Sequence, residues 1–142
     1  MSAVSIREFS YPEDYHATLA LWKSMEKGLN VGPSDAPDEI RKKLERDGDL
    51  FLVAATDTRI VGTVIGGFDG RRGFVYHLAV AMDFRRNGLG RKLMGEVEQR
   101  LRSKGCIRCF LFVRPDNPEA QGFYEGLGWQ ALDDVPLAKN LA

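Results

Sequence analysis

The sequence has no long hydrophobic run, no excess of charge of either sign and only two cysteines. No apolar run approaches the roughly 18 residues that span a bilayer, so we expect no contact with a membrane. Lys plus Arg number 20 and Asp plus Glu number 20, and this balance argues against nucleic acid as a partner. The N-terminal residues lack the basic and apolar regions of a signal peptide, which predicts a cytoplasmic protein.

The two cysteines, Cys106 and Cys109, form a Cys-x-x-Cys pair, a pattern that elsewhere serves redox or metal chemistry. No helix start follows directly to activate a thiolate, and no second Cys/His pair completes a zinc site. Both cysteines lie in a strand-like run over 106–113. We therefore interpret them as small strand residues and predict no metal site.

The 142 residues are enough for one sizeable core, and we predict a single domain over residues 1–142. Ser10 is a candidate cap for a first helix that ends near Gly28, before a loop over 28–37. The order of elements predicts an α/β (α+β) fold with a mixed, mainly antiparallel sheet of six to seven strands and helices on both faces. The predicted strands are 5–9, 50–55, 60–68, 74–80, 106–113, 129–132 and 137–141, and further helices are predicted at 38–46, 88–104 and from 118 onward.

The hexapeptide from Arg85 to Gly90 joins a predicted strand to a predicted helix. Its glycines, Gly88 and Gly90, let the backbone turn tightly and approach a ligand closely. A helix start offers unpaired N–H groups and the positive end of the helix dipole. With two arginines beside it, this loop predicts a seat for a phosphate or pyrophosphate.

The loop has three other interpretations. A Rossmann fingerprint needs a third glycine where this chain has Leu93, and it needs an acidic residue after the next strand. A P-loop needs Lys and Ser or Thr after its last glycine, but Arg91 and Lys92 follow Gly90. If the loop is taken alone, a tight turn with solvated arginines is the favoured explanation of the glycines.

A second segment, Asn117 to Trp129, decides between these interpretations. Together the two segments resemble the signature motifs of GNAT-superfamily acyl-CoA N-acyltransferases, and more narrowly the small bacterial YpeA-like acetyltransferases. The first signature is Arg/Gln-x-x-Gly-x-Gly/Ala after a strand ending Leu-x-Val, and the second is Asn-x-x-Ala-x-x-Phe-Tyr-Glu-x-Leu-Gly-aromatic. The matching positions are Leu78, Val80, Arg85, Gly88, Gly90, Asn117, Ala120, Phe123, Tyr124, Glu125, Leu127, Gly128 and Trp129.

The resemblance implies acetyl-CoA as co-substrate. The loop amides would wrap the pyrophosphate of coenzyme A, and the strand backbone from Leu78 to Val80 would pair with the pantetheine arm. Such pairing implies a sheet splayed between its fourth and fifth strands. The residues implied in cofactor binding are Leu78, Ala79, Val80, Arg85, Arg86, Asn87, Gly88, Leu89, Gly90, Arg91, Asn117 and Tyr124.

The resemblance also implies that Tyr124 is the general acid that protonates the leaving thiolate, while Asn117 bonds the pantetheine. A phenol has a pKa of about 10 and a thiol about 8.5, so full proton transfer from Tyr124 to the thiolate is unfavourable. Donating a hydrogen bond to the sulfur requires less of Tyr124 than transferring the proton. The alternatives are a core tyrosine at 124 and a helix cap at 117.

The general base is where the chain departs from the family pattern. Many relatives carry a glutamate on one of the two splayed strands, and the corresponding positions here are Phe74 and Phe112. His77 is a candidate because a histidine titrates near neutrality. Strand alternation places it on the face opposite Leu78 and Val80, which favours a partly buried structural histidine. Glu26, Asp35 and Asp69 are further candidates, and Trp22, Met25 and Tyr76 are candidate lining residues for an acceptor pocket.

The resemblance implies an N-acetyltransferase that transfers acetyl from acetyl-CoA to a primary amine by direct attack. The acceptor is a small molecule, a protein N-terminus or a lysine, and the chain is a candidate homodimer. The alternative is a non-catalytic acyl-CoA-binding or sensory module, motivated by the missing glutamates.

Overall fold

The computed structural model describes residues 3–27 and 29–142, which divide into two compact units at residues 1–111 and 112–142. The first unit holds the sheet and three of the α-helices, and the second holds one. The elements in chain order are β1 (Ser5–Glu8), α1 (Tyr15–Lys23), η1 (Pro33–Asp35), α2 (Pro37–Asp47), η2 (Gly48–Leu50), β2 (Phe51–Ala55), β3 (Ile60–Phe68), β4 (Gly73–Val80), η3 (Met82–Phe84), α3 (Leu89–Ser103), β5 (Cys109–Phe110) and α4 (Pro118–Gly126).

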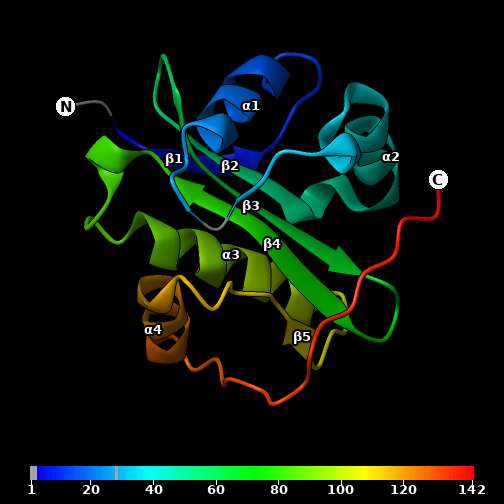
Figure 1. The fold of residues 1–142 in the computed structure, drawn as a ribbon. Coiled ribbons are helices and arrows are strands. Elements are labelled where there is room, and N and C mark those ends of the chain that lie inside the picture. Colours follow the sequence, from blue (N-terminus) through cyan, green and yellow to red (C-terminus); the bar gives the residue numbers. More distant parts are fainter. Residues whose placement is uncertain (1–2, 28) are drawn as a thin grey trace. The chain divides into compact units, whose positions relative to one another are not determined.

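In the first unit the strands form one sheet in the order β1-β2-β3-β4-β5 (Figure 1). The first four strands pair antiparallel, and β5 pairs parallel with β4. The five residues of β2 are all buried, and this strand is paired on both edges. The predicted mixed, mainly antiparallel sheet is confirmed.

Helices α1 and α3 cover opposite faces of this sheet, as Figure 1 shows. Trp22 of α1 donates its indole N–H to the Thr63 hydroxyl at 2.8 Å. Gly66 faces α3 so closely that a Cβ there would lie 2.8 Å from the Val97 side chain. Because neighbouring residues of a strand point to opposite faces, odd positions near Thr63 face α1 and even positions face α3. The prediction of helices on both faces is confirmed for this unit.

Strand β4 carries a β-bulge where it passes β3. Thr63 lies opposite Ala79 but Ile65 lies opposite Tyr76, so His77 and Leu78 together oppose one residue of β3. His77 has a φ of +54°, a left-handed conformation that a non-glycine residue seldom adopts. Bulges of this kind bend a strand and re-aim a side chain, and they are frequent beside active sites.

The predicted six to seven strands are too many: the described residues contain five. The predicted strand over 106–113 shortens to Cys109–Phe110, because Cys106 instead ends α3 by donating its amide to the carbonyl of Leu101. Neither 129–132 nor 137–141 is a strand. The last of these segments, Leu-Ala-Lys-Asn-Leu, has no β-branched residue to favour an extended chain.

The other strand predictions are confirmed to within a residue, as are the helices at 38–46 and 88–104. Ser10 does not cap the first helix. Asp14 occupies the N-cap position of α1, and its carboxylate accepts the Ser10 amide at 2.8 Å. The helix ends at Lys23, and the predicted end near Gly28 falls on a residue outside the described ranges. None of the helices in those ranges is long and apolar enough to cross a membrane.

Candidate acyl-CoA site

The loop from Arg85 to Gly90 leaves a run of backbone amides unpaired at the start of α3. Arg85 donates its amide to the Met82 carbonyl at 3.3 Å, and the next amide that donates is that of Lys92, to Gly88 at 3.0 Å. Between them, no amide from Arg86 to Arg91 donates a hydrogen bond to any described residue. Consecutive free amides at a helix start are the groups that bind a phosphate. Of the predicted wrapping amides, that of Arg85 already donates within the chain, and the others are available.

Two residues hold this loop in left-handed backbone conformations. Gly88, the N-cap of α3, has a φ of +78°, and Arg86 has a φ of +66°. A Cβ added at Gly88 would meet no atom within 4 Å, so the glycine is required by its backbone angle rather than by space. The alternation of these conformations turns successive N–H groups toward one side, which is the geometry of an anion-binding nest.

The positive charges around the loop have no acidic partner among the described residues. Arg86, Arg91 and Lys92 are exposed and form no ion pair there. The Arg85 guanidinium folds back instead, donating to the Val80 carbonyl at 3.1 Å and lying 3.6 Å from the Met25 sulfur. This contact ties the loop to the end of β4 and to the residues after α1.

The C-terminal half of β4 lacks a neighbouring strand on one edge. Strand β5 pairs only with Gly73 and Phe74, so in the described chain the segment Leu78–Val80 pairs with β3 alone. Leu78 and Val80 are half-buried and Ala79 is buried. An unpaired strand edge presents N–H and C=O groups that can bond an extended ligand.

Immediately before this edge, His77 joins a buried hydrogen-bonded network that sequence analysis did not assemble. Its Nε2 lies 2.9 Å from an Asp35 carboxylate oxygen, and its ring meets the edge of the Trp22 ring at 4.6 Å between centroids. The Thr63 hydroxyl accepts from Trp22 and donates to the His77 carbonyl at 2.9 Å. The only sequence signal for Thr63 is that it is a polar residue in an otherwise apolar strand.

Asp35 brings the loop before α2 to this network. Its carboxylate also accepts the Gly32 amide at 3.0 Å, and its carbonyl accepts the Tyr15 hydroxyl at 2.8 Å. Burial raises the pKa of the Asp35 carboxyl, but the hydrogen bonds from His77 and Gly32 outweigh burial and leave that pKa below its ordinary value. Asp35 is therefore ionised at neutral pH.

Neither Asp69 nor Glu26, the two further sequence candidates for the base, joins this network. Asp69 lies in the hairpin between β3 and β4, where its carboxylate accepts the amides of Arg71 and Arg72 at 2.8 Å each. These hydrogen bonds lower the pKa of Asp69. The register puts this hairpin at the opposite end of β4 from Leu78–Val80. Glu26 is exposed and has no ion-pair or hydrogen-bond partner among the described residues.

The second unit contains the two remaining predicted site residues on α4. The Asn117 carboxamide oxygen caps this helix by accepting the Ala120 amide at 3.2 Å, which leaves its NH₂ group free to donate. Tyr124 is half-buried between the rings of Phe123 and Trp129. Burial raises the pKa of Tyr124 to about 12, so the hydroxyl keeps its proton at neutral pH.

The cysteines have no features of a reactive pair. Cys106 is buried and its thiol lies 3.3 Å from the Arg108 carbonyl, which it can donate to. Burial raises the pKa of the Cys109 thiol to about 11, with a further contribution from Cys106. Cys109 is therefore a thiol rather than a nucleophilic thiolate at neutral pH.

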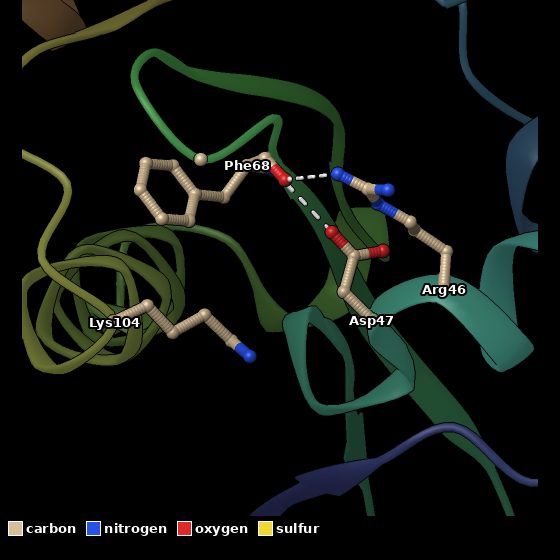
Figure 2. A pocket seen from close by; sticks show the side chains of 5 residues that line it. Arg46, Asp47, Phe68 and Lys104 are labelled. Carbon is tan, nitrogen blue, oxygen red and sulfur yellow. Dashed lines mark hydrogen bonds between the residues drawn. The ribbon is translucent and has the colours of Figure 1, made fainter.

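A pocket of about 220 Å³ lies away from these groups, between the end of α2, the β3–β4 hairpin and the end of α3. Figure 2 shows Phe68 among the residues that line it, with its amide donating to Asp47 and its carbonyl accepting from Arg46. Lys104 approaches from the far side and pairs with Asp49 at 2.9 Å. The pocket contains none of the predicted site residues, and its polar groups are largely satisfied by one another.

The chain is similar to known proteins in sequence and in fold. Residues 15–129 match the acetyltransferase (GNAT) family model. An acetyltransferase of Pectobacterium atrosepticum is 39% identical over 130 residues, covering 91% of this chain and 90% of that protein. One from Yersinia enterocolitica is 37% identical, covering 97% and 96%. The solved structure of PaiA N-acetyltransferase from Thermoplasma acidophilum in complex with coenzyme A superposes with a TM-score of 0.80 at 20% identity, covering 94% and 93%.

Proposed function

The chain belongs to the GNAT acetyltransferase family, and on that premise we propose that it transfers the acetyl group of acetyl-CoA to a primary amine by direct attack. The family uses acetyl-CoA, and family membership decides for an enzyme over a non-catalytic CoA-binding module. The acceptor is an amine on a small molecule, a protein N-terminus or a lysine. We further propose that residues 1–142 act as a single domain, because the family model spans both compact units.

The observation that carries this proposal is the run of free amides from Arg86 to Arg91. A pyrophosphate needs several hydrogen-bond donors and positive charge at one place. The loop offers both, since Arg86, Arg91 and Lys92 are exposed and have no acidic partner in the described chain. A fold neighbour bound to coenzyme A gives independent support for a coenzyme A site on this fold.

The free edge of β4 would receive the pantetheine arm. Pantetheine contains two amide groups, which can pair with a strand as a peptide does. Pairing between β4 and β5 stops at Phe74, so the edge of Leu78–Val80 is open to such a ligand, as a splayed sheet requires. This arrangement would bring the thioester to the bulge at His77 and Leu78.

Tyr124 is our candidate for the group that assists the leaving sulfur, and Asn117 our candidate for a pantetheine contact. With a pKa of about 12, the Tyr124 phenol holds its proton more firmly than a thiol of pKa about 8.5. Tyr124 would therefore donate a hydrogen bond to the sulfur as negative charge develops there, which favours the transition state over the ground state.

Replacing Tyr124 by Phe tests this function. We expect the turnover number with an accepted amine to fall about 100-fold or more, the range for loss of a general acid, while calorimetry shows unchanged acetyl-CoA affinity. Tyr11→Phe is the matched control, because the Tyr11 hydroxyl makes no hydrogen bond in the described chain and its ring packs against Arg41. Unchanged turnover in Tyr124→Phe across an amine library would remove Tyr124 from the mechanism, and absence of acetyl-CoA binding by the native chain would overturn the proposed function.

A further inference from the structure

We propose that His77 is the general base of this acetyltransferase, with Nδ1 as its basic atom and Asp35 as the residue that positions the imidazole. The proposal rests on the proposed function and adds the group that accepts the amine's proton. It also explains why the chain functions with Phe74 and Phe112 at the positions where many relatives carry a glutamate.

The tautomer follows from the contact with Asp35. A carboxylate accepts hydrogen bonds and donates none, so the Asp35 oxygen 2.9 Å away requires the proton of neutral His77 to be on Nε2. The unprotonated nitrogen is then Nδ1, which has no hydrogen-bond partner among the described residues. The His77 side chain is 19% exposed and that of Asp35 only 8%, so the imidazole is accessible while the carboxylate is enclosed.

The ring is held in place from several sides. The bulge and the positive φ of His77 aim the side chain at the α1 face, where it packs against Trp22. The Thr63 hydroxyl fixes the His77 carbonyl at 2.9 Å and is itself fixed by Trp22. Backbone strain of this kind persists only where the surroundings impose it, and such positions cluster at functional sites.

The alternation of the strand does not exclude His77 from the reaction. Leu78 and Val80 point to the α3 face and His77 to the α1 face, as strand alternation predicts. The pantetheine, however, would pair with the edge of β4, which lies in the plane between the two faces. An amine arriving from the α1 face can therefore meet both the thioester carbon and the Nδ1 atom of the residue preceding Leu78.

Few titratable groups contact the ring. Asp35 from η1 and Tyr76 from β4 are the titratable groups in contact with the ring, and Tyr15 from α1 reaches it only through the Asp35 carbonyl. Burial raises the pKa of Tyr76 to about 12, so Tyr76 stays neutral. The neighbours from α1 and β3, Trp22 and Thr63, do not titrate. Asp35 is thus the one charged group in contact with the ring among the described residues.

The proton balance is complete without any further reactant. Nδ1 takes one proton from the ammonium group, and the free amine then attacks the thioester carbonyl carbon to form the C–N bond. As the C–S bond breaks, the nitrogen loses a second proton and the thiolate gains one. The products are the amide, the thiol of coenzyme A and one proton that His77 returns to water.

The test compares His77→Gln with His16→Gln. These are the only two histidines in the chain, and His16 is exposed on α1 with its ring against Tyr15. We expect His77→Gln to lower kcat/KM for an accepted amine by 10²- to 10⁴-fold at neutral pH without weakening acetyl-CoA binding. The difference in kcat/KM between His77→Gln and the native chain should shrink about tenfold per unit as the pH rises, because the amine then loses its proton without a base. The kcat/KM profile of His16→Gln should match the native one.

Asp35→Asn distinguishes positioning from a structural role. Loss of the carboxylate should lower kcat/KM, because nothing then fixes the proton of the neutral imidazole on Nε2. In the His16→Gln background the remaining histidine gives a single set of imidazole ¹⁵N resonances. At neutral pH we expect a proton on Nε2 with Asp35 present and a loss of that preference in Asp35→Asn.

The outcomes separate the two proposals. Transfer by the native chain with an unchanged pH profile in His77→Gln would overturn the assignment of the base alone, as would a proton on Nδ1 in the ¹⁵N spectrum. Absence of transfer to any amine by the native chain would overturn the proposed function and the base together. If His77→Gln unfolds, exogenous imidazole added to His77→Ala should restore transfer, and failure to restore it in a folded variant would count against the proposal.

Discussion

The loop from Arg86 to Arg91 follows β4, and the network around His77 is centred on β4 itself, yet their polar groups differ in how they are paired. The loop leaves consecutive amides and three basic side chains without partners in the described chain. The network pairs Trp22, Thr63, His77 and Asp35 with one another. Unpaired donors at an exposed helix start predict a bound anion, whereas a closed network with a single open nitrogen predicts a preorganised reacting group.

The largest effect should be the loss of stability in Thr63→Val, which removes the hydroxyl at the centre of the network. The variant leaves the Trp22 N–H and the His77 carbonyl without their partner, and we expect a loss of about 1–3 kcal/mol in the free energy of unfolding. Urea denaturation measures this loss. Acetyl-CoA affinity should be unchanged, since the loop is intact.

Thr18→Val is the matched control for Thr63→Val. Thr18 is equally buried, but its hydroxyl is the one buried side-chain oxygen or nitrogen in the described ranges that has no hydrogen-bond partner. Replacing it by a methyl group loses no hydrogen bond, so stability should be unchanged or higher. Equal losses in both variants would show that the network contributes nothing beyond packing.

A smaller effect, on ligand binding rather than on stability, is expected for Gly88→Val. A β-branched residue at a φ of +78° is strained, so the loop should shift and the free amides lose their alignment. We expect calorimetry to show acetyl-CoA affinity reduced by about tenfold or more. Gly95→Ala is the control, because it lies in the interior of α3 with nothing within 4 Å of a Cβ and should bind acetyl-CoA normally.

The smallest effect should come from the exposed charges of the loop. Reversing Arg86 and Arg91 to Glu should weaken acetyl-CoA binding several-fold at low salt, and the difference should shrink as salt is added because exposed charges are screened. Arg71→Glu is the control, since Arg71 lies in the hairpin at the other end of β4 and forms no ion pair in the described chain. A salt-independent difference would indicate that the arginines act through loop structure.

The open edge of β4 could not be predicted from the sequence. The apolar run over 106–113 predicts a full strand, but only Cys109 and Phe110 pair with β4. A strand exists only where a neighbour accepts its hydrogen bonds, and a run of apolar residues does not reveal how far that neighbour extends. The same limit explains the predicted strands at 129–132 and 137–141, which find no partner in the described chain.

The sequence by itself determined the order of elements, the tight turn at Gly88 and the family, because hydrophobic periodicity, glycine conformation and motif spacing are local properties. Only the tertiary structure decided the partners of His77. Asp35, Thr63 and Trp22 are separated from His77 by 14 residues or more, and the sheet and the loop before α2 bring them together. The bulge that aims His77 arises from an extra residue in β4 relative to β3, a feature of strand pairing that neither strand encodes alone.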